Sequence, residues 1–228
     1  MEGELSDSLV RADSLGDRLA RTLRDRIVRG EITPGTHLVE DTVAESFDVS
    51  RGPVRDALRM LRLENLVEPQ RRGVHVVGLS TTDVRELYAI RQAIEGLAVT
   101  TAIGLGEHRS GAGMAQALRG MADTATPTHA AKFAEYDLLF HRGIYEASGN
   151  RRLLTMWLQI EPLFASMLAV TNSEDEDLSP VVTAHEKLRD AIVAGDNAEA
   201  TALLTSHLEG SEKRMLSALQ RIWANSVS

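Results

Sequence analysis

Four side chains in the second half of the sequence could together hold a divalent metal ion. Asp137 and His141 are four residues apart, so on a helix both project from the same face. His185 lies in the first turns of a helix predicted after Ser179-Pro180, and His207 lies midway along the last predicted helix. Three antiparallel helices can bring these groups to one point inside a bundle. Three imidazoles and one carboxylate suit Zn²⁺, and also Ni²⁺, Co²⁺ or Mn²⁺.

The same spacing also has an ordinary structural interpretation. An Asp-x3-His pair on a helix is more often a surface ion pair than a pair of metal ligands. His185 could act in helix capping, and His207 could be exposed. Spacing alone therefore leaves the metal site as one of two interpretations. The other histidines have no partners at ligand spacing and are interpreted as surface residues: His37, His75, His108 and His129.

Arg91 is a candidate for binding a small acidic ligand. It stands in a predicted helix among the apolar residues Tyr88, Ile90 and Ile94, with Glu95 one turn further on. An arginine in a bundle cavity can grip a carboxylate with two parallel N–H groups. The alternative is a simple ion pair between Arg91 and Glu95.

A row of arginines in the first half of the sequence could bind nucleic acid. Arg51, Arg55, Arg59 and Arg62 follow one another at steps of four, four and three, so they share one face of a helix. Ser50 is placed to cap this helix. Such a row can contact phosphates and guanine edges repeatedly, although an isolated row of this kind is more often a solvated helix face.

The segments around this row predict a winged helix-turn-helix over residues 14–78. A helix over 15–27 ends at Gly30, a short amphipathic helix covers 38–47, and only three residues separate it from the arginine-bearing helix. So tight a connection suits a helix-turn-helix. Two short apolar runs then flank Arg71, Arg72 and Gly73, which predicts a β-hairpin, and Pro69 limits its strand to an edge.

The remaining sequence predicts an all-α domain, so the fold class is mostly α. Residues 79–81 form a linker, and residues 82–228 contain about six helices with apolar residues at helical spacing. Thr126-Pro127 is placed to start one helix, and Pro162 predicts a kink or restart near Glu161 in the next. Residues 1–13 are predicted to be a disordered arm.

Composition limits the partners and the compartment. The net charge is −8, but residues 14–78 carry 11 arginines against 10 acidic residues, whereas residues 79–228 carry an excess of six acidic residues. A local basic patch on an acidic protein can still bind DNA, with weak non-specific affinity. The chain has no cysteine and no apolar run near the roughly 20 residues of a membrane helix, so we expect a cytoplasmic protein without disulfides.

The order of these motifs resembles the FadR subfamily of GntR-family transcription regulators, whose second domain is the helical FCD-type ligand-binding domain. The first half carries Pro34-Gly35-Thr36, Leu38-x-Glu40, Val43-Ala44, Val49-Ser50-Arg51-x-Pro53-Val54-Arg55-x-Ala57-Leu58, Asn65-Leu66-Val67 and Arg72-Gly73-Val74. The second half carries Glu86-Leu87-Tyr88-x-x-Arg91, Asp137-x-x-Phe140-His141, Gly149-Asn150, Ala184-His185, Gly195-Asp196 and His207-Leu208. Asp48 and Asn65 stand where the family usually has glycine.

The resemblance implies a metabolite-responsive, DNA-binding transcription regulator, typically a repressor, that binds a pseudo-palindromic operator as a homodimer. It implies a divalent ion, with zinc favoured, on Asp137, His141, His185 and His207, and a small organic-acid effector bound with help from Arg91. Glu95, one turn from Arg91, is a further candidate for binding the effector. The DNA contacts are then expected from Ser50, Arg51, Gly52, Arg55, Arg59, Arg62, Arg71, Arg72 and Gly73. The alternatives are a metal sensor or constitutive DNA binder with a structural metal and, less favoured, a metal-dependent enzyme.

Overall fold

The computed structural model describes residues 14–106 and 111–226. The predicted arm over residues 1–13 and His108 lie outside the described residues. The described chain folds as two compact units. The first contains residues 14–27 and Ile32–Gly78, and the second contains Val28–Glu31 and the described residues from Leu79 onward. Each unit has its own core.

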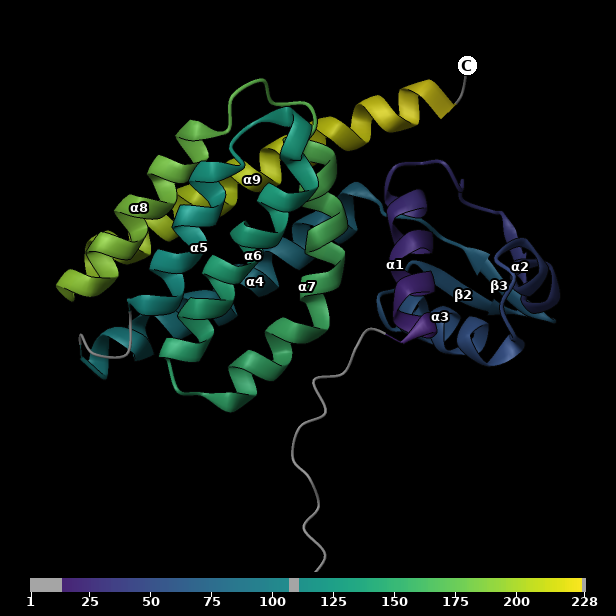
Figure 1. The fold of residues 1–228 in the computed structure, drawn as a ribbon, viewed down its shortest axis with the longest axis horizontal. Helices are drawn as coiled ribbons and strands as arrows, with labels where there is room; N and C mark the ends of the chain where they lie inside the picture. The colour runs from purple at the N-terminus through teal and green to yellow at the C-terminus, as the bar shows by residue number, and fades with distance from the viewer. Residues whose placement is uncertain (1–13, 107–110, 227–228) are drawn as a thin grey trace, which may run out of the picture. The chain divides into compact units, whose positions relative to one another are not determined.

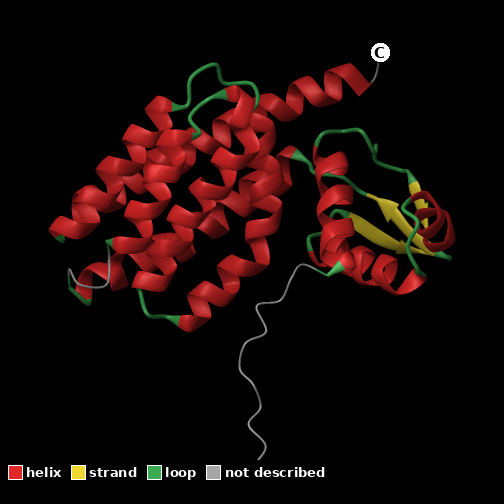
Figure 2. Cartoon of the chain, viewed as in Figure 1, coloured by secondary structure: helices red, strands yellow, loops and turns green. Residues whose placement is uncertain are grey.

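The first unit packs three helices on a small sheet. Its elements are α1 (Leu15–Val28), β1 (His37–Val39), α2 (Glu40–Ser46), α3 (Arg51–Leu63), β2 (Val67–Gln70) and β3 (Gly73–Val76). The strands, which are yellow in Figure 2, form an antiparallel sheet. The strand order is β1-β3-β2. The apolar face of α3 supplies much of the core, because Val54, Ala57, Leu58 and Leu61 are all buried. This is the predicted winged helix-turn-helix.

The predicted helix over 38–47 was wrong at its start. Leu38 and Val39 belong to β1, which pairs with β3, and α2 begins only at Glu40. Three residues are too few to show the alternation of a strand, so the apolar pair looked like the beginning of the helix that follows. The predicted hairpin is therefore two strands of a three-stranded sheet. Pro69 does lie on an edge strand, as predicted.

The turns of the first unit depend on left-handed backbone conformations. Asp48, between α2 and α3, has φ 49°, and Asn65 has φ 58°. Both have short polar side chains, which tolerate this conformation better than other non-glycine residues do. Gly73 has φ 146°, and a Cβ atom there would lie 2.1 Å from the carbonyl oxygen of Leu38. Only glycine fits where β3 passes β1.

The second unit is a bundle of six α-helices in the described residues. They are α4 (Thr81–Gly104), α5 (Ala112–Asp123), α6 (Ala130–Ala147), α7 (Arg151–Asn172), α8 (Ser179–Ala194) and α9 (Asn197–Ser226) (Figure 1). A 3₁₀ turn, η2 (Pro127–His129), precedes α6. Ser80 and Asp83 form a capping box at α4, and the Asn150 side chain accepts two backbone N–H groups at the start of α7.

Two predicted helix boundaries differ from the structure. Thr126-Pro127 opens the 3₁₀ turn rather than the α-helix, which starts at Ala130. α7 continues through Pro162, so the restart that was one of the two outcomes expected near Glu161 is absent, and the other outcome, a kink, stays a prediction. Much of this helix is buried, so packing can offset the backbone hydrogen bond that proline removes.

Among the described residues, α7 is the one helix long and apolar enough to meet a length-and-composition test for a membrane span. Half of its most apolar window is buried inside the bundle, as in a core helix. The helix is therefore weak evidence for a membrane crossing.

Candidate functional sites

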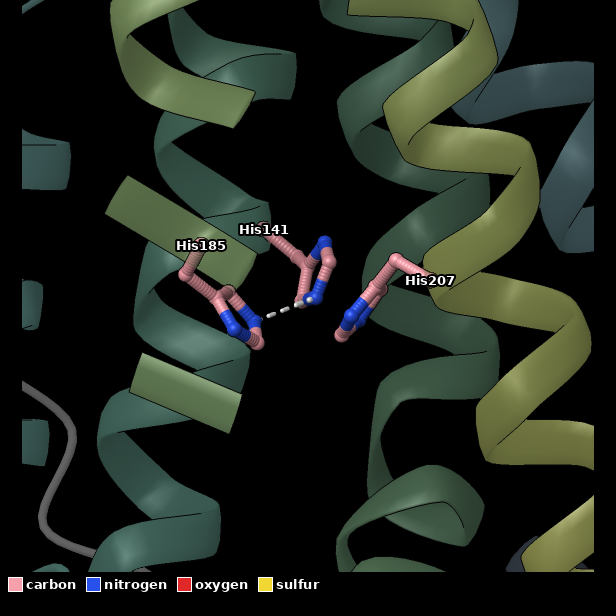
Figure 3. Close-up of side chains that lie close together, drawn as sticks. All are labelled: His141, His185 and His207. Atoms are coloured by element: carbon pink, nitrogen blue, oxygen red, sulfur yellow. Dashed lines mark hydrogen bonds between the residues drawn. The ribbon is translucent and has the colours of Figure 1, made fainter. Parts of the chain in front are cut away.

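The four predicted metal ligands meet inside the helical bundle. Asp137 and His141 come from α6, His185 from α8 and His207 from α9. The three imidazole rings face one another, as Figure 3 shows, and one nitrogen of each ring lies within 4.8 Å of the others. The interpretation of Asp137 and His141 as a surface pair is wrong, because they are 3% and 0% exposed.

Two rings aim their Nε2 atoms at the same point. The Nε2 atoms of His141 and His185 lie 3.2 Å apart. The Asp137 carboxylate lies 3.5 Å from each of these nitrogens, through Oδ1 to His141 and Oδ2 to His185. Two donor atoms on one tetrahedral Zn²⁺ at about 2.0–2.1 Å are themselves about 3.3–3.4 Å apart. The observed separations fit a shared cation.

The other nitrogen of each of these two rings is engaged by an acceptor. His185 Nδ1 donates to the carbonyl oxygen of Val181 at 2.7 Å. His141 Nδ1 contacts the Glu95 carboxylate, which accepts hydrogen bonds and cannot donate them. In the neutral rings Nδ1 therefore carries the proton and Nε2 carries the lone pair. Two lone pairs facing each other at 3.2 Å repel unless a proton or a metal ion lies between them.

Burial keeps two of the histidines neutral. Loss of hydration lowers the pKa of His185 to about 4, although Asp137 acts in the opposite direction. Loss of hydration, together with the neighbouring His185 and His141 rings, also lowers the pKa of His207 well below its usual value, although the His207 side chain stays partly exposed. Neutral imidazoles are the form that binds metals. Phe140 packs its ring edge against His141 and His185, which limits their rotation.

Arg91 and Glu95 lie fully buried on α4, beside the histidines. Arg91 Nε donates to Glu95 Oε2 at 3.0 Å, so the predicted helical ion pair is present. The Arg91 guanidinium also lies 5.1 Å from the ring centroid of Trp157 and 4.8 Å from that of Phe164. Burial favours a neutral Glu95, but His141 and Arg91 outweigh this effect and lower its pKa to about 2.

Two buried polar atoms at this site have no hydrogen-bond partner among the described residues. They are Arg91 Nη2 and Asp137 Oδ1. A buried cationic N–H group without an acceptor costs free energy. An acidic ligand at Arg91 and a cation at Asp137 would satisfy both atoms. The residues of the chain therefore fit a metal ion with a nearby anionic group.

The predicted DNA-binding residues lie on the first unit. Arg51, Arg55, Arg59 and Arg62 are all exposed on the face of α3 opposite its buried side chains, and Arg71 and Arg72 are exposed at the turn between β2 and β3. Ser50 is the N-cap residue of α3 but makes no capping hydrogen bond with its side chain. Gly52 is exposed in the first turn, and Gly73 begins β3.

Acidic side chains of α2 hold the two leading arginines of this row. Arg51 Nε lies 2.6 Å from Asp41 Oδ1, and Arg55 Nε lies 2.8 Å from Glu40 Oε2. The hydrogen bond and the charge of Glu40 raise the pKa of Arg55. Both pairs are exposed, so DNA phosphates can compete for the arginines.

Two contacts of residues singled out in the sequence, one between His37 and His75 and one between Glu95 and His141, could not be predicted from the sequence. His37 and His75, interpreted as surface residues without partners, face each other across β1 and β3 with ring centroids 5.1 Å apart. His75 is only partly exposed. This pairing was missed because β1 was missed. The contact of Glu95 with His141 joins residues 46 positions apart and has no local sequence signal.

The first unit is a winged helix-turn-helix, and the second is a helical bundle that contains the cluster of Asp137 and three histidines. Together they define a transcription regulator that binds DNA. The sequence matches the bacterial regulatory proteins of the gntR family over residues 15–77 and the FCD domain over residues 86–210. The chain therefore belongs to the GntR family of regulators and carries an FCD domain.

Named relatives agree with this assignment. The chain is 30% identical to the gluconate operon transcriptional repressor of Bacillus subtilis (strain 168), covering 81% of this chain and 78% of the relative. It is 30% identical to the probable D-xylose utilization operon transcriptional repressor of Paenarthrobacter nicotinovorans, covering 86% and 90%. A crystal structure of a GntR transcriptional regulator from Rhodococcus sp. RHA1 is similar at 27% identity and a TM-score of 0.63, covering 89% and 98%. These relatives are transcription regulators, not enzymes.

Proposed function

We propose that this chain is a metabolite-responsive repressor of the FadR subfamily. Its helical domain binds one divalent ion, with Zn²⁺ favoured, and a small organic acid that changes the affinity of the winged helix for DNA. The observation that carries the proposal is the convergence of Asp137, His141, His185 and His207 beside a buried arginine nitrogen without a partner.

Each group at the site has a distinct role in this proposal. Asp137 and the three histidines hold the ion, and the bound ion supplies a fixed positive charge that attracts and can coordinate a carboxylate. Arg91 is the second cation of the site, since its Nη2 is free to donate to the acid group of the effector. Trp157 and Phe164 hold the guanidinium in place while it does so.

The names of the relatives suggest the class of acid. One relative represses a gluconate operon, and gluconate is a hydroxy acid with one carboxylate. A hydroxy acid can present its carboxylate to Arg91 while adjacent oxygens reach an ion, which prefers oxygen or nitrogen donors. Hydroxycarboxylic acids are therefore the first compounds to test.

On DNA, we propose that Arg51 and Arg55 enter the major groove and that Arg59 and Arg62 approach the backbone. Arg71 and Arg72 at the wing then reach the neighbouring minor groove or phosphates. A homodimer would match a pseudo-palindromic operator by its two-fold symmetry. Ile90 and Leu97, seven residues apart on α4, are 47% and 54% exposed and offer an apolar face for such a partner. We expect a cytoplasmic protein.

A second function has one observation in its favour. Asp137, His141 and His185 are at most 3% exposed, so an ion among them is enclosed and could serve as a structural pin or as the signal itself. The protein would then be a constitutive DNA binder or a metal sensor.

A metabolite sensor has a further requirement. Effector binding must stabilise one arrangement of the DNA-binding units over the other, because otherwise it does not change the affinity for DNA.

A thermal-shift screen of organic acids, with and without a chelator, separates these functions. A hydroxy acid that raises the melting temperature of the metal-loaded protein, and not of the chelated protein, supports a metabolite sensor. The same acid must change binding to a DNA duplex selected from a random pool by the wild-type protein. If chelation alone releases the duplex and no acid has an effect, the chain is a metal sensor.

A further inference from the structure

Glu95 connects the histidine cluster to the buried Arg91 through hydrogen bonds. Its Oε1 accepts from His141 Nδ1, and its Oε2 accepts from Arg91 Nε at 3.0 Å and lies 3.5 Å from the Tyr145 hydroxyl. Glu95 is 0% exposed, so water cannot replace these partners. It is therefore held at both oxygens, from two sides.

We propose that Glu95 is a positioning residue that fixes His141 for metal binding and transmits the state of Arg91 to the metal site. This inference rests on the proposed metal function. It replaces the direct effector contact expected for Glu95 with an indirect role, because both carboxylate oxygens are already engaged by Arg91 and His141. Arg91 and the metal ligands then act as one coupled unit.

The contact with His141 sets which ring nitrogen can bind the ion. Because a carboxylate only accepts, it selects the tautomer with the proton on Nδ1 and the lone pair on Nε2. That Nε2 atom is the one that faces His185 Nε2 at 3.2 Å and Asp137 Oδ1 at 3.5 Å. An ionised acceptor also makes the imidazole a stronger ligand, and loss of such outer partners typically lowers metal affinity about 10- to 100-fold.

The contact with Arg91 fixes the carboxylate itself. The guanidinium cannot move freely, because it packs near the rings of Trp157 and Phe164. Without Arg91, Glu95 would lose its one cationic partner among the described residues and could turn away from His141. A change at Arg91 should therefore weaken metal binding, although Arg91 contacts none of the four ligands by a hydrogen bond or ion pair in the described structure.

The test measures Zn²⁺ affinity of the full chain, with Zn²⁺ alone as the probe and a chromophoric chelator as competitor. The variants are Glu95→Gln and Arg91→Met. Glu161→Gln is the matched control, since Glu161 is also buried and paired with an arginine, Arg142 at 2.6 Å, but has no hydrogen bond or ion pair with the histidines in the described structure. We expect the dissociation constant to rise about 10- to 100-fold in Glu95→Gln. It should rise at least severalfold in Arg91→Met and stay unchanged in Glu161→Gln.

Wild-type affinity in Glu95→Gln, or in Arg91→Met, overturns the inference while leaving the metal site intact. A wild-type chain that binds no Zn²⁺ refutes the proposed function instead, so the two failures are distinguishable.

Glu95→Gln leaves Arg91 buried without a charged partner and can fail to fold. The double variant Arg91→Met with Glu95→Gln removes both charges together and should fold, with the same loss of Zn²⁺ affinity as Glu95→Gln.

A second measurement uses the wild-type protein. Nitrogen-15 spectra of labelled histidines in the Zn²⁺-loaded chain should show His141 protonated at Nδ1 and bound to metal through Nε2. A proton on Nε2 of His141 would overturn the proposal.

Discussion

At the scale of single residues, the most informative group is the buried guanidinium of Arg91, which has too few hydrogen-bond acceptors around it. Arg91 has one ion pair, two aromatic neighbours and one nitrogen left without an acceptor among the described residues. Burying a cation is costly unless it is paired and fully hydrogen-bonded. An N–H donor without an acceptor, in a buried site, is what the carboxylate of an acidic ligand needs in order to bind.

Arg55 is the residue of α3 whose loss should most directly weaken DNA binding. It is exposed and already oriented by Glu40. We predict that Arg55→Ala weakens binding to a duplex selected by the wild-type protein by at least about fivefold. Quantitative gel shifts at physiological salt test this, with Arg151→Ala, an exposed arginine of the helical bundle, as the control. Equal affinity of Arg55→Ala and the wild type would remove α3 from the DNA interface.

Asp41 should limit binding to DNA of arbitrary sequence. Its carboxylate pairs with Arg51 and places a negative charge beside the phosphate-binding row. We predict that Asp41→Asn tightens binding to a random-sequence duplex by about two- to fivefold and steepens its dependence on salt. Fluorescence anisotropy at several salt concentrations measures both quantities. An unchanged salt dependence would show that Arg51 does not reach phosphates.

The buried His185 should make the metal-free protein sensitive to acid. Its pKa is about 4 in the folded chain and near 6.5 when unfolded, so between these values the unfolded chain binds more protons. The contribution of His185 to the free energy of unfolding is therefore fully present above pH 6.5. It decreases by about 3 kcal/mol in total as the pH falls toward 4. Thermal unfolding with chelator across this range should show the loss, and His185→Gln should reduce it. A flat profile would mean that His185 is not buried in neutral form.

The sequence predicted most of the residues of the site but not their connections. Asp137 and His141 share a helix face, which sequence spacing can show, whereas the approach of His185 and His207 depends on how α6, α8 and α9 pack. The role of Glu95 depends on packing alone, because α4 and α6 are brought together only by the folded bundle. Tertiary contacts between distant segments leave no periodic trace in a sequence.

At the scale of elements, long amphipathic helices were predictable and short or irregular ones were not. The helices that carry the proposed metal ligands were all expected, because their apolar residues recur over many turns. β1 has three residues and was assigned to a helix, and the 3₁₀ turn at Pro127 was assigned to α6. The continuity of α7 through Pro162 could not be predicted either, since packing of the helix decides whether a proline interrupts it.

The wing of the first unit depends on one glycine, which makes its stability testable. We predict that Gly73→Ala destabilises this unit by about 2 kcal/mol or more, because the new Cβ atom would lie 2.1 Å from the Leu38 carbonyl oxygen. Gly35→Ala is the matched control: Gly35 also has a left-handed φ, 85°, but has open space around it. That control should cost only about 1 kcal/mol. Similar losses in chemical denaturation would show that β1 does not pass so close to β3.

At the scale of the whole molecule, charge is divided between the two units. The first carries 11 arginines on residues 14–78 of a chain whose net charge is −8, and six of them stand on α3 or the wing turn. The acidic second unit repels DNA and leaves binding to the arginine surface. Sequence-specific contacts are therefore expected to supply a large share of the affinity for the operator.

The account depends most directly on the metal content of the purified full-length chain. Elemental analysis of the wild type should find about one divalent ion per chain, with zinc favoured. The variant that combines His185→Ala with His207→Ala should retain almost none, while His75→Ala, a histidine of the first unit, should retain the wild-type amount. Equal metal content in the wild type and the double variant would contradict the site and the effector mechanism built on it.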